Sequence, residues 1–265
     1  MILIDTEKIL STDLKYILNG PFLSTLILSA LLIIFSLVIF FKAKKALKNP
    51  LETPKGILFL FMMLVNFMDN LVVEIMGEHN KKFGGYITCV AIFLFTGFIF
   101  SITGLPSPVG SLTFPLILAT GTFILVHATA IKYNRWGYFK RYIDPIPIFL
   151  PINLITMWAP LLSMALRLFG NATAGYCIMT CLYYALAGLG DLMTGGLASG
   201  SLAPFGPASF WTPALVTPIF HLYFDFFSGF IQTTVFVMLT MINIYQEQPE
   251  DLDQVIDSAR IVEQK

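Results

Sequence analysis

The sequence predicts an all-α integral membrane protein with about five membrane helices and one amphipathic helix that lies in the membrane interface. Of its 265 residues, 56% are hydrophobic and only 12% are charged, whereas about a quarter of the residues in an ordinary soluble domain are charged. Uncharged runs of about twenty residues or more recur along the chain, and each is long enough to cross the hydrocarbon core of a bilayer. A soluble protein is therefore excluded.

The charge balance and the cysteines exclude several further classes. Sixteen Lys and Arg residues match sixteen Asp and Glu residues, so the formal net charge is zero and a basic, nucleic-acid-binding chain is excluded. The three cysteines are too few, and their surroundings too apolar, for a disulfide framework or a zinc site. The sequence also contains neither an HExxH metal motif nor a GxxxxGKS or GxxxxGKT phosphate loop. No metal, cofactor or catalytic residue is predicted.

The first membrane helix is predicted at residues 21–41, after an outer N-terminal segment of residues 1–20. The run carries no charge, and at about 1.5 Å per residue it reaches roughly 30 Å, the thickness of the hydrocarbon core. It does not resemble a cleavable signal peptide, because it is too long and its positive residues follow it instead of preceding it. We expect it to remain as a helix.

Residues 42–82 are predicted to form an inner loop and an interfacial helix. Within them, the stretch 57–77 is apolar throughout in its first half only. Its second half places polar and acidic residues four apart on one helical face, namely Asn66, Asn70, Glu74 and Glu78. Because the wholly apolar part is too short to span a bilayer, we expect an amphipathic helix in the interface.

Residues 83–246 are predicted to form one helical domain. Two spans, 83 to about 104 and 114–131, are separated by a turn rich in Gly, Pro and Ser. Two longer runs, 145–190 and 213–246, then carry one charged side chain each. Since each run is longer than a perpendicular crossing needs, we expect these last two helices to be long and strongly tilted.

The orientation follows from the basic residues, which concentrate on the cytoplasmic side of membrane proteins. They cluster after the first helix, just before residue 83 and between residues 132 and 141, whereas the turn near 105–112 and the loop near 190–212 contain none. One topology satisfies this distribution, with the N-terminus outside and the acidic tail of residues 247–265 inside, in the cytoplasm. A bacterial plasma membrane is expected, since no transit peptide precedes the first helix.

Arg167 is the single charged side chain of the run 145–190. An arginine at the bilayer centre costs about 2.5–3.5 kcal/mol on insertion scales, and charges at this depth usually have a function. Helical geometry places small and polar residues on its face, namely Ser163, Gly170, Asn171 and Ala174. Another helix can approach such a face closely and meet the guanidinium. The opposite face carries a second polar strip, Tyr176, Thr180 and Tyr183.

Asp225 is the single charged side chain of the run 213–246. The same geometry puts a histidine, an acid and an amide on one face of this otherwise apolar helix, namely His221, Asp225, Gly229 and Gln232. These residues suggest a wet path inside the protein. Two plainer interpretations stay open: Arg167 and Asp225 form a structural ion pair, or His221 only decorates the interface. For His127, a turn from Lys132 near the inner interface, an interfacial role is favoured.

Residues 161–176, LLSMALRLFGNATAGY, resemble the signature of subunit a of F-type ATP synthases, which has a SLxLRLFGNxxAG core. Three further segments fit that family in the same order. They are TGLPSP at the turn near residue 105, PIPIFLPINLI before the arginine helix, and FIQTTVFVMLTMINIY at residues 230–245. The resemblance covers roughly residues 55–246, and the RLFGN string is highly specific.

The resemblance assigns the primary site residues by position. Arg167 matches the family's essential arginine, and Asn171 matches its neighbouring asparagine. Gln232 matches the glutamine of the last helix, and Asp225, seven residues earlier, falls where relatives place Glu, Asp or His in the ion path. We expect these four residues to take part in ion translocation, which makes 83–246 the ion-translocating domain.

Two departures from the family pattern leave the lining of the outer half-channel open. Tyr176 stands where many relatives carry Glu or His. Asn153 and Thr156 lie in the stretch before the arginine, where many relatives carry one or two glutamates. Together with His221, these residues are the secondary half-channel candidates.

The family implies a stator that stands beside a rotating ring of c subunits, each with a carboxylate in mid-membrane. Two half-channels would let H⁺ or Na⁺ reach and leave the ring, and so couple ion flow to ATP synthesis. The implied partners are the c-subunit ring, the b-subunit peripheral stalk, membrane lipid and, indirectly, the F1 head. The chain has no nucleotide site and is not expected to be an enzyme on its own. The choice between H⁺ and Na⁺ is expected to lie in the c subunit.

Two other functions compete with this one on the residues alone. The first is an autonomous secondary transporter in which Arg167 binds an anionic substrate. Such folds commonly contain internal repeats, and the sequence shows none. The second is a scaffold for other membrane subunits that transports nothing. Neither explains the RLFGN string.

Overall fold

All regular elements that the structure describes are helices. The computed structural model covers residues 20–46, 56–103, 106–135, 150–193 and 208–249. Six helical stretches of these residues are long and apolar enough to cross a membrane. The predicted class, an all-α membrane protein, is confirmed. Nearly all of the predicted N-terminal segment and inner tail lies outside the described residues.

Helix α2, Pro21–Ala46, contains the predicted first membrane helix, which was expected to end at residue 41. Lysines favour the helical state, and their charges near the C-terminus interact favourably with the helix dipole. The helix therefore continues through Lys42, Lys44 and Lys45. Most of its apolar side chains are exposed, as is typical of a helix that is apolar all round and spans a membrane.

Helix α3, Ile57–Met76, coincides with the predicted interfacial helix. Its polar residues Asn66, Asn70 and Glu74 are exposed, as the pattern predicts, whereas Met76 is fully buried. The helix ends where Gly77 adopts a φ of 85°, a conformation that glycine tolerates without strain. By length and composition α3 is also able to cross a membrane, so its interfacial position stays a prediction.

Helices α4, Gly84–Ile99, and α5, Thr113–Asn134, form the next pair. They match the predicted spans 83–104 and 114–131 once the 3₁₀ turn Phe100–Thr103, which continues α4, is included. Between the two helices lies a second 3₁₀ turn, Pro108–Gly110, in the predicted turn region.

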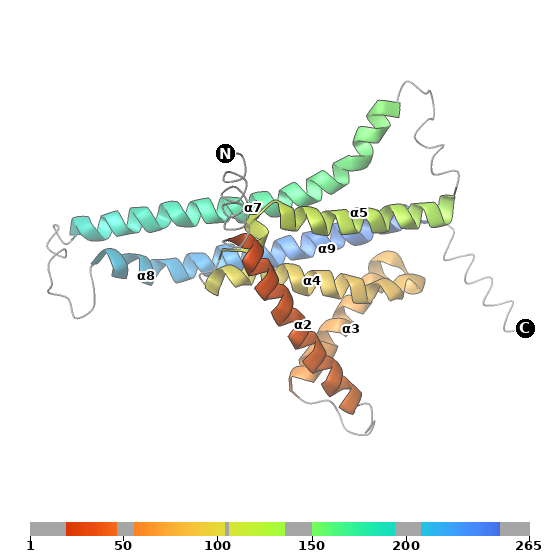
Figure 1. The fold of residues 1–265 in the computed structure, drawn as a ribbon, viewed down its shortest axis with the longest axis horizontal. Coiled ribbons are helices and arrows are strands. Elements are labelled where there is room, and N and C mark those ends of the chain that lie inside the picture. Colours follow the sequence, from red (N-terminus) through yellow and green to blue (C-terminus); the bar gives the residue numbers. More distant parts are fainter. Residues whose placement is uncertain (1–19, 47–55, 104–105, 136–149, 194–207, 250–265) are drawn as a thin grey trace, which may run out of the picture.

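Helix α7, Leu150–Met193, is one helix of 44 residues. At about 1.5 Å per residue it extends about 66 Å, roughly twice the hydrocarbon thickness of a bilayer. Pro160 lies inside it and removes one backbone hydrogen bond, which explains the bend in its green, N-terminal part (Figure 1). A helix of this length cannot cross a membrane perpendicularly without protruding far into water, in agreement with the expected tilt.

The last helical stretch has three consecutive parts: α8, Ala208–His221, a π-helical segment, Leu222–Phe227, and α9, Ser228–Gln246. The sequence pattern predicted one helix over residues 213–246 and contained no sign of the π-helical segment. Such segments are rare, and they occur frequently at functional sites. Here the segment carries Asp225.

Helices α4, α5, α7, α8 and α9 extend along the long direction of the molecule, whereas α2 runs across them (Figure 1). These helices and α2 therefore cannot all be perpendicular to one membrane. The long helices share an apolar core that includes Leu94, Phe98, Phe114, Leu168 and Phe236. This core holds α7 and α9 against each other.

A pair of buried amides fixes the end of α9. Asn80, in the 3₁₀ turn Glu78–Phe83 that follows α3, and Gln248, just after α9, exchange two hydrogen bonds of 2.8 and 3.0 Å. Asn80 also donates to the carbonyl oxygen of Met76, 2.6 Å away. Buried polar groups of this kind need their partners, so the pair ties the end of α9 to the end of α3.

Candidate functional site

Arg167 lies exposed on α7, and within the described residues it has no ion pair or hydrogen bond. The small residues predicted on its face, Ser163, Gly170 and Ala174, are exposed as well. Apart from its chain neighbours and the nearby backbone of its own helix, no atom of the described chain lies within 4 Å of the position that a Cβ would take at Gly170. The open face beside Arg167, formed by these three residues, can therefore receive a helix from another molecule.

Asn171 connects this region of α7 to the first residue of α9. Its Nδ2 donates to Oγ of Ser228 at 2.9 Å, and that hydroxyl donates back to Oδ1 of Asn171 at 3.1 Å. The sequence singled out Asn171 but not Ser228. A serine in a long apolar run carries no signal of its own until the packing of the two helices is known.

Gln232 lies with Arg167 at one cavity of about 320 Å³ between α7 and the last helical stretch. The cavity is lined by Arg167, Asn171, Tyr223, Phe227, Ser228, Ile231 and Gln232. Gln232 is only 7% exposed, and its Nε2 has no hydrogen-bond partner in the described part of the protein. Three of the four primary residues predicted from the sequence thus meet at one place.

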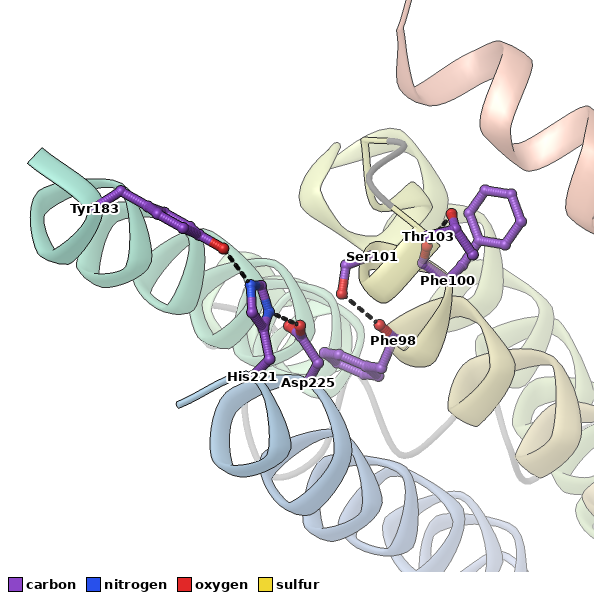
Figure 2. A network of polar contacts seen from close by, with 7 residues as sticks. All are labelled: Phe98, Phe100, Ser101, Thr103, Tyr183, His221 and Asp225. Carbon is purple, nitrogen blue, oxygen red and sulfur yellow. Dashed lines mark hydrogen bonds and ion pairs between the residues drawn. The ribbon is translucent and has the colours of Figure 1, made fainter. Parts of the chain in front are cut away.

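Asp225, the fourth, belongs to a different group. Its Oδ2 lies 2.5 Å from Nδ1 of His221, and Nε2 of the same imidazole lies 2.7 Å from the hydroxyl of Tyr183 on α7 (Figure 2). The interpretation of Arg167 and Asp225 as a structural ion pair is therefore wrong, because the ionic partner of Asp225 is His221. Both ring nitrogens of His221 have partners, and a role for it beyond the interface stays a prediction.

The sequence placed His221, Asp225, Gly229 and Gln232 on one face of the last helix, and a common role for the four stays a prediction. Gly229 packs against α4, where an added Cβ would lie 2.7 Å from Cβ of Phe98, whereas Gln232 lines the arginine cavity. Gly229 and Gln232 both belong to α9 and lie three residues apart, whereas Asp225 belongs to the π-helical segment before it.

The group around Asp225 lies beside the end of α4. Gly229, which packs on Phe98, is one turn from Asp225, and Figure 2 shows the side chains of Phe98, Ser101 and Asp225 in the same region. The Ser101 and Thr103 hydroxyls donate to carbonyl oxygens of their own helix turn, at 2.8 and 2.7 Å. These two hydroxyls are therefore satisfied within the turn that ends α4.

A second cavity, of about 300 Å³, lies between α5, α7 and the end of α9. Its polar lining consists of Thr122, His127, Asn153, Thr156, Asn243, Gln246 and Glu247. The cavity reaches Met164, one turn before Arg167, and Nδ2 of Asn243 lies 3.7 Å from Sδ of Met164. The sequence favoured an interfacial role for His127 and missed its place in this lining.

The secondary candidates therefore fall on two sides of Arg167. Asn153 lies 14 residues before Arg167 on α7 and Tyr183 lies 16 residues after it, which corresponds to about 21 and 24 Å along the helix. Asn153 and Thr156 belong to the second cavity, and His221 belongs to the Asp225 group. Tyr176 is 72% exposed. It lines neither the Arg167 cavity nor the cavity at Asn153.

Comparison with known proteins gives a consistent result. Residues 22–245 match the family model described as "ATP synthase A chain". ATP synthase subunit a of Mycoplasma genitalium is 32% identical over 83% of this chain and 78% of its own length. The same subunit of Mycoplasmoides gallisepticum is 31% identical over 84% and 77%. A subunit a described as sodium ion specific, from Propionigenium modestum, is 28% identical over 84% and 73%.

Proposed function

The chain belongs to the family of ATP synthase subunit a, and on that basis we propose that it is the stator subunit through which H⁺ or Na⁺ reaches and leaves a rotating ring of c subunits. As a member of this family it is a membrane component of a rotary ATP synthase. Beyond family membership, we propose that the chain forms two half-channels, stands beside the ring and couples ion flow to ATP synthesis.

The observation that carries the proposal is the exposed Arg167 on a membrane helix. An unpaired charge at the bilayer centre is costly, and the described residues provide no acid to pair with it. The open face of Ser163, Gly170 and Ala174 lets another helix come close. A mid-membrane carboxylate on a ring subunit supplies both the missing charge and the missing helix.

The electrostatics of such an encounter suit ion release. A guanidinium about 4 Å from a carboxylate contributes about 4 kcal/mol at an effective dielectric constant near 20, equivalent to about three pKa units. Arg167 would therefore keep the passing ring carboxylate ionised and make it shed its ion. Arginine suits this role because its guanidinium cannot lose its proton, whereas a buried lysine could become neutral and let ions leak past.

The polar groups on either side of Arg167 supply two separate routes. With the predicted orientation, the start of α7 and the end of α9 face the cytoplasm. We therefore assign the cavity at Asn153 and Thr156 to the inner half-channel, although the sequence suggested these two residues for the outer one. The Asp225–His221 pair then belongs to the outer half-channel. The ring carboxylate must travel around the ring to pass from one route to the other.

The energy for ATP synthesis comes from the membrane potential. Each elementary charge that moves through 100 mV supplies about 2.3 kcal/mol, and several charges together suffice to drive ATP formation in the F1 head. The proposed partners are the c-subunit ring, the b-subunit peripheral stalk and, indirectly, that head. The exposed apolar surface of α2 would face lipid. The proposed location is a bacterial plasma membrane, with the N-terminus outside and the C-terminus in the cytoplasm.

The experiment replaces Arg167 by Ala and, separately, by Lys in the intact complex. ATP-driven ion uptake into inverted membrane vesicles is measured, and assembly is checked by co-purification of the ring and head. Both variants should assemble and lose pumping, whereas Lys45→Ala, which removes a cation at the end of α2, should pump normally. Pumping retained by assembled Arg167→Ala would refute the proposal and leave a scaffold or an autonomous transporter.

A further inference from the structure

We propose that Tyr183 is the outermost member of a proton relay, Tyr183–His221–Asp225, and that the ion using this route is H⁺. The proposal rests on the proposed function, because it identifies the ion and one further residue of the outer half-channel. Tyr183 was not among the site residues predicted from the sequence, and it belongs there because of its contact with His221.

The three side chains form one continuous chain of hydrogen bonds between α7 and the last helical stretch (Figure 2). The Tyr183 hydroxyl is 2.7 Å from Nε2 of His221, and Nδ1 of His221 is 2.5 Å from Oδ2 of Asp225. Both nitrogens of one imidazole are thus engaged, one on each side. In this arrangement an imidazole can accept a proton at one nitrogen and donate a proton from the other.

The exposed fraction of the side chains decreases from Tyr183 to Asp225, as expected for a relay that takes up protons at its outer end. Tyr183 is 39% exposed, whereas the side chains of His221 and Asp225 are 30% and 18% exposed. Tyr183 therefore lies at the most accessible end of the hydrogen-bonded chain, and the carboxylate of Asp225 lies deepest. Asp225 is also closest along the chain to Ser228 and Gln232, which line the Arg167 cavity.

The transfer step conserves every proton. The Tyr183 hydroxyl gives its proton to Nε2 of His221 while Nδ1 gives its own proton to Oδ2 of Asp225. A hydronium ion on the outer side returns a proton to the phenolic oxygen and becomes water, so no phenolate remains. Asp225 then passes its proton inward to the carboxylate of the ring subunit and is a carboxylate again. The imidazole gives its Nε2 proton to water and takes a proton from water at Nδ1, which restores the first tautomer. Each group accepts as many protons as it donates.

The same groups are poorly suited to carry Na⁺. Hard cations of this kind prefer several oxygen ligands, such as carboxylates, carbonyls and water. Here one carboxylate oxygen is engaged by an imidazole nitrogen at 2.5 Å, and the middle of the route offers nitrogen atoms. A sodium ion would have to break both hydrogen bonds to pass, whereas a proton needs them.

The test compares Tyr183→Phe with Tyr184→Phe in the intact complex. Tyr184, the next residue, is 78% exposed and outside the chain of hydrogen bonds, so its variant is a matched control. After removal of the head, vesicles are given a potassium diffusion potential, and passive H⁺ and Na⁺ fluxes are measured separately. Arg167→Ala is measured in parallel by ATP-driven pumping.

Tyr183→Phe should lower the H⁺ flux about a hundredfold or more, a loss in the range for one positioned proton-transfer group, and Tyr184→Phe should leave it unchanged. The wild-type complex should conduct H⁺ in the absence of Na⁺. Unchanged H⁺ flux in Tyr183→Phe, or a wild-type flux that requires Na⁺, would overturn the relay. The proposed function would still stand in that case if Arg167→Ala abolished pumping, and would fall with it if Arg167→Ala pumped normally.

Discussion

Asn171 of α7 and Ser228 of α9 exchange two hydrogen bonds, of 2.9 and 3.1 Å, one turn from Arg167. This exchange joins the arginine helix to the first residue after the π-helical segment. It lies at the wall of the cavity that also contains Gln232. The position of Arg167 relative to the last helix therefore depends on a pair of polar side chains within an otherwise apolar contact.

Replacing Ser228 by Ala should weaken this connection. The amide of Asn171 would lose both partners, and an unmet hydrogen bond of this kind costs about 1–3 kcal/mol. ATP-driven pumping in vesicles should fall severalfold, without loss of assembly, because α7 and α9 are no longer held in register. Thr234→Ala is the control, since Thr234 lies exposed on α9 and bonds only to its own helix. Equal pumping by the two variants would contradict the positioning role.

Replacing Gly229 by Ala should destabilise the contact between α4 and α9. The added Cβ would lie 2.7 Å from Cβ and 2.9 Å from Cγ of Phe98, closer than side-chain atoms approach without a shift. Overpacking of this kind costs about 1–3 kcal/mol. The thermal stability of the detergent-solubilised complex measures the effect. Gly85→Ala, where an added Cβ meets nothing within 4 Å, should be neutral. Equal melting temperatures for the two variants would show that the contact between α4 and α9 accommodates the added methyl group.

Replacing Thr156 by Val tests the inner half-channel. The substitution keeps the shape of the side chain and removes a hydroxyl from the lining of the cavity of about 300 Å³. Ion flux should fall severalfold, since an apolar wall disfavours water. Thr180→Val is a matched control, because both hydroxyls donate to the carbonyl four residues earlier on α7. A similar loss in both variants would assign the effect to helix stability instead.

Much of the architecture could be predicted from the sequence, because a helix that crosses a membrane needs a long run without charged residues. Runs without charge located α2, α4 and α5 to within a few residues at most ends, and the length of α7 followed from the distance between charges. The small residues around Arg167 correctly predicted a face that the described chain leaves open. These features depend on one helix at a time, so local patterns suffice.

The missed features depend on how two or more helices meet. One such feature is the π-helical segment that carries Asp225, and no residue pattern in 222–227 indicated it. Tyr183 and Ser228 belong to the site only because of their hydrogen-bond partners. These are His221 and Asn171, which lie 38 and 57 positions away in the sequence. His127 lines a cavity together with residues at the end of α9, which is far from it in the sequence.

The most direct test of the central claim asks whether the ring lies against the open face beside Arg167. Gly170→Cys is introduced into a chain whose native cysteines are Ser, together with single cysteines flanking the ring carboxylate, and the assembled complex is oxidised. A disulfide between this subunit and the c subunit should form readily from Gly170→Cys. None should form from Ala165→Cys, because Ala165 is buried in the core at 1% exposure. Failure at Gly170 in an assembled complex, with cross-linking at Ala165, would contradict the account.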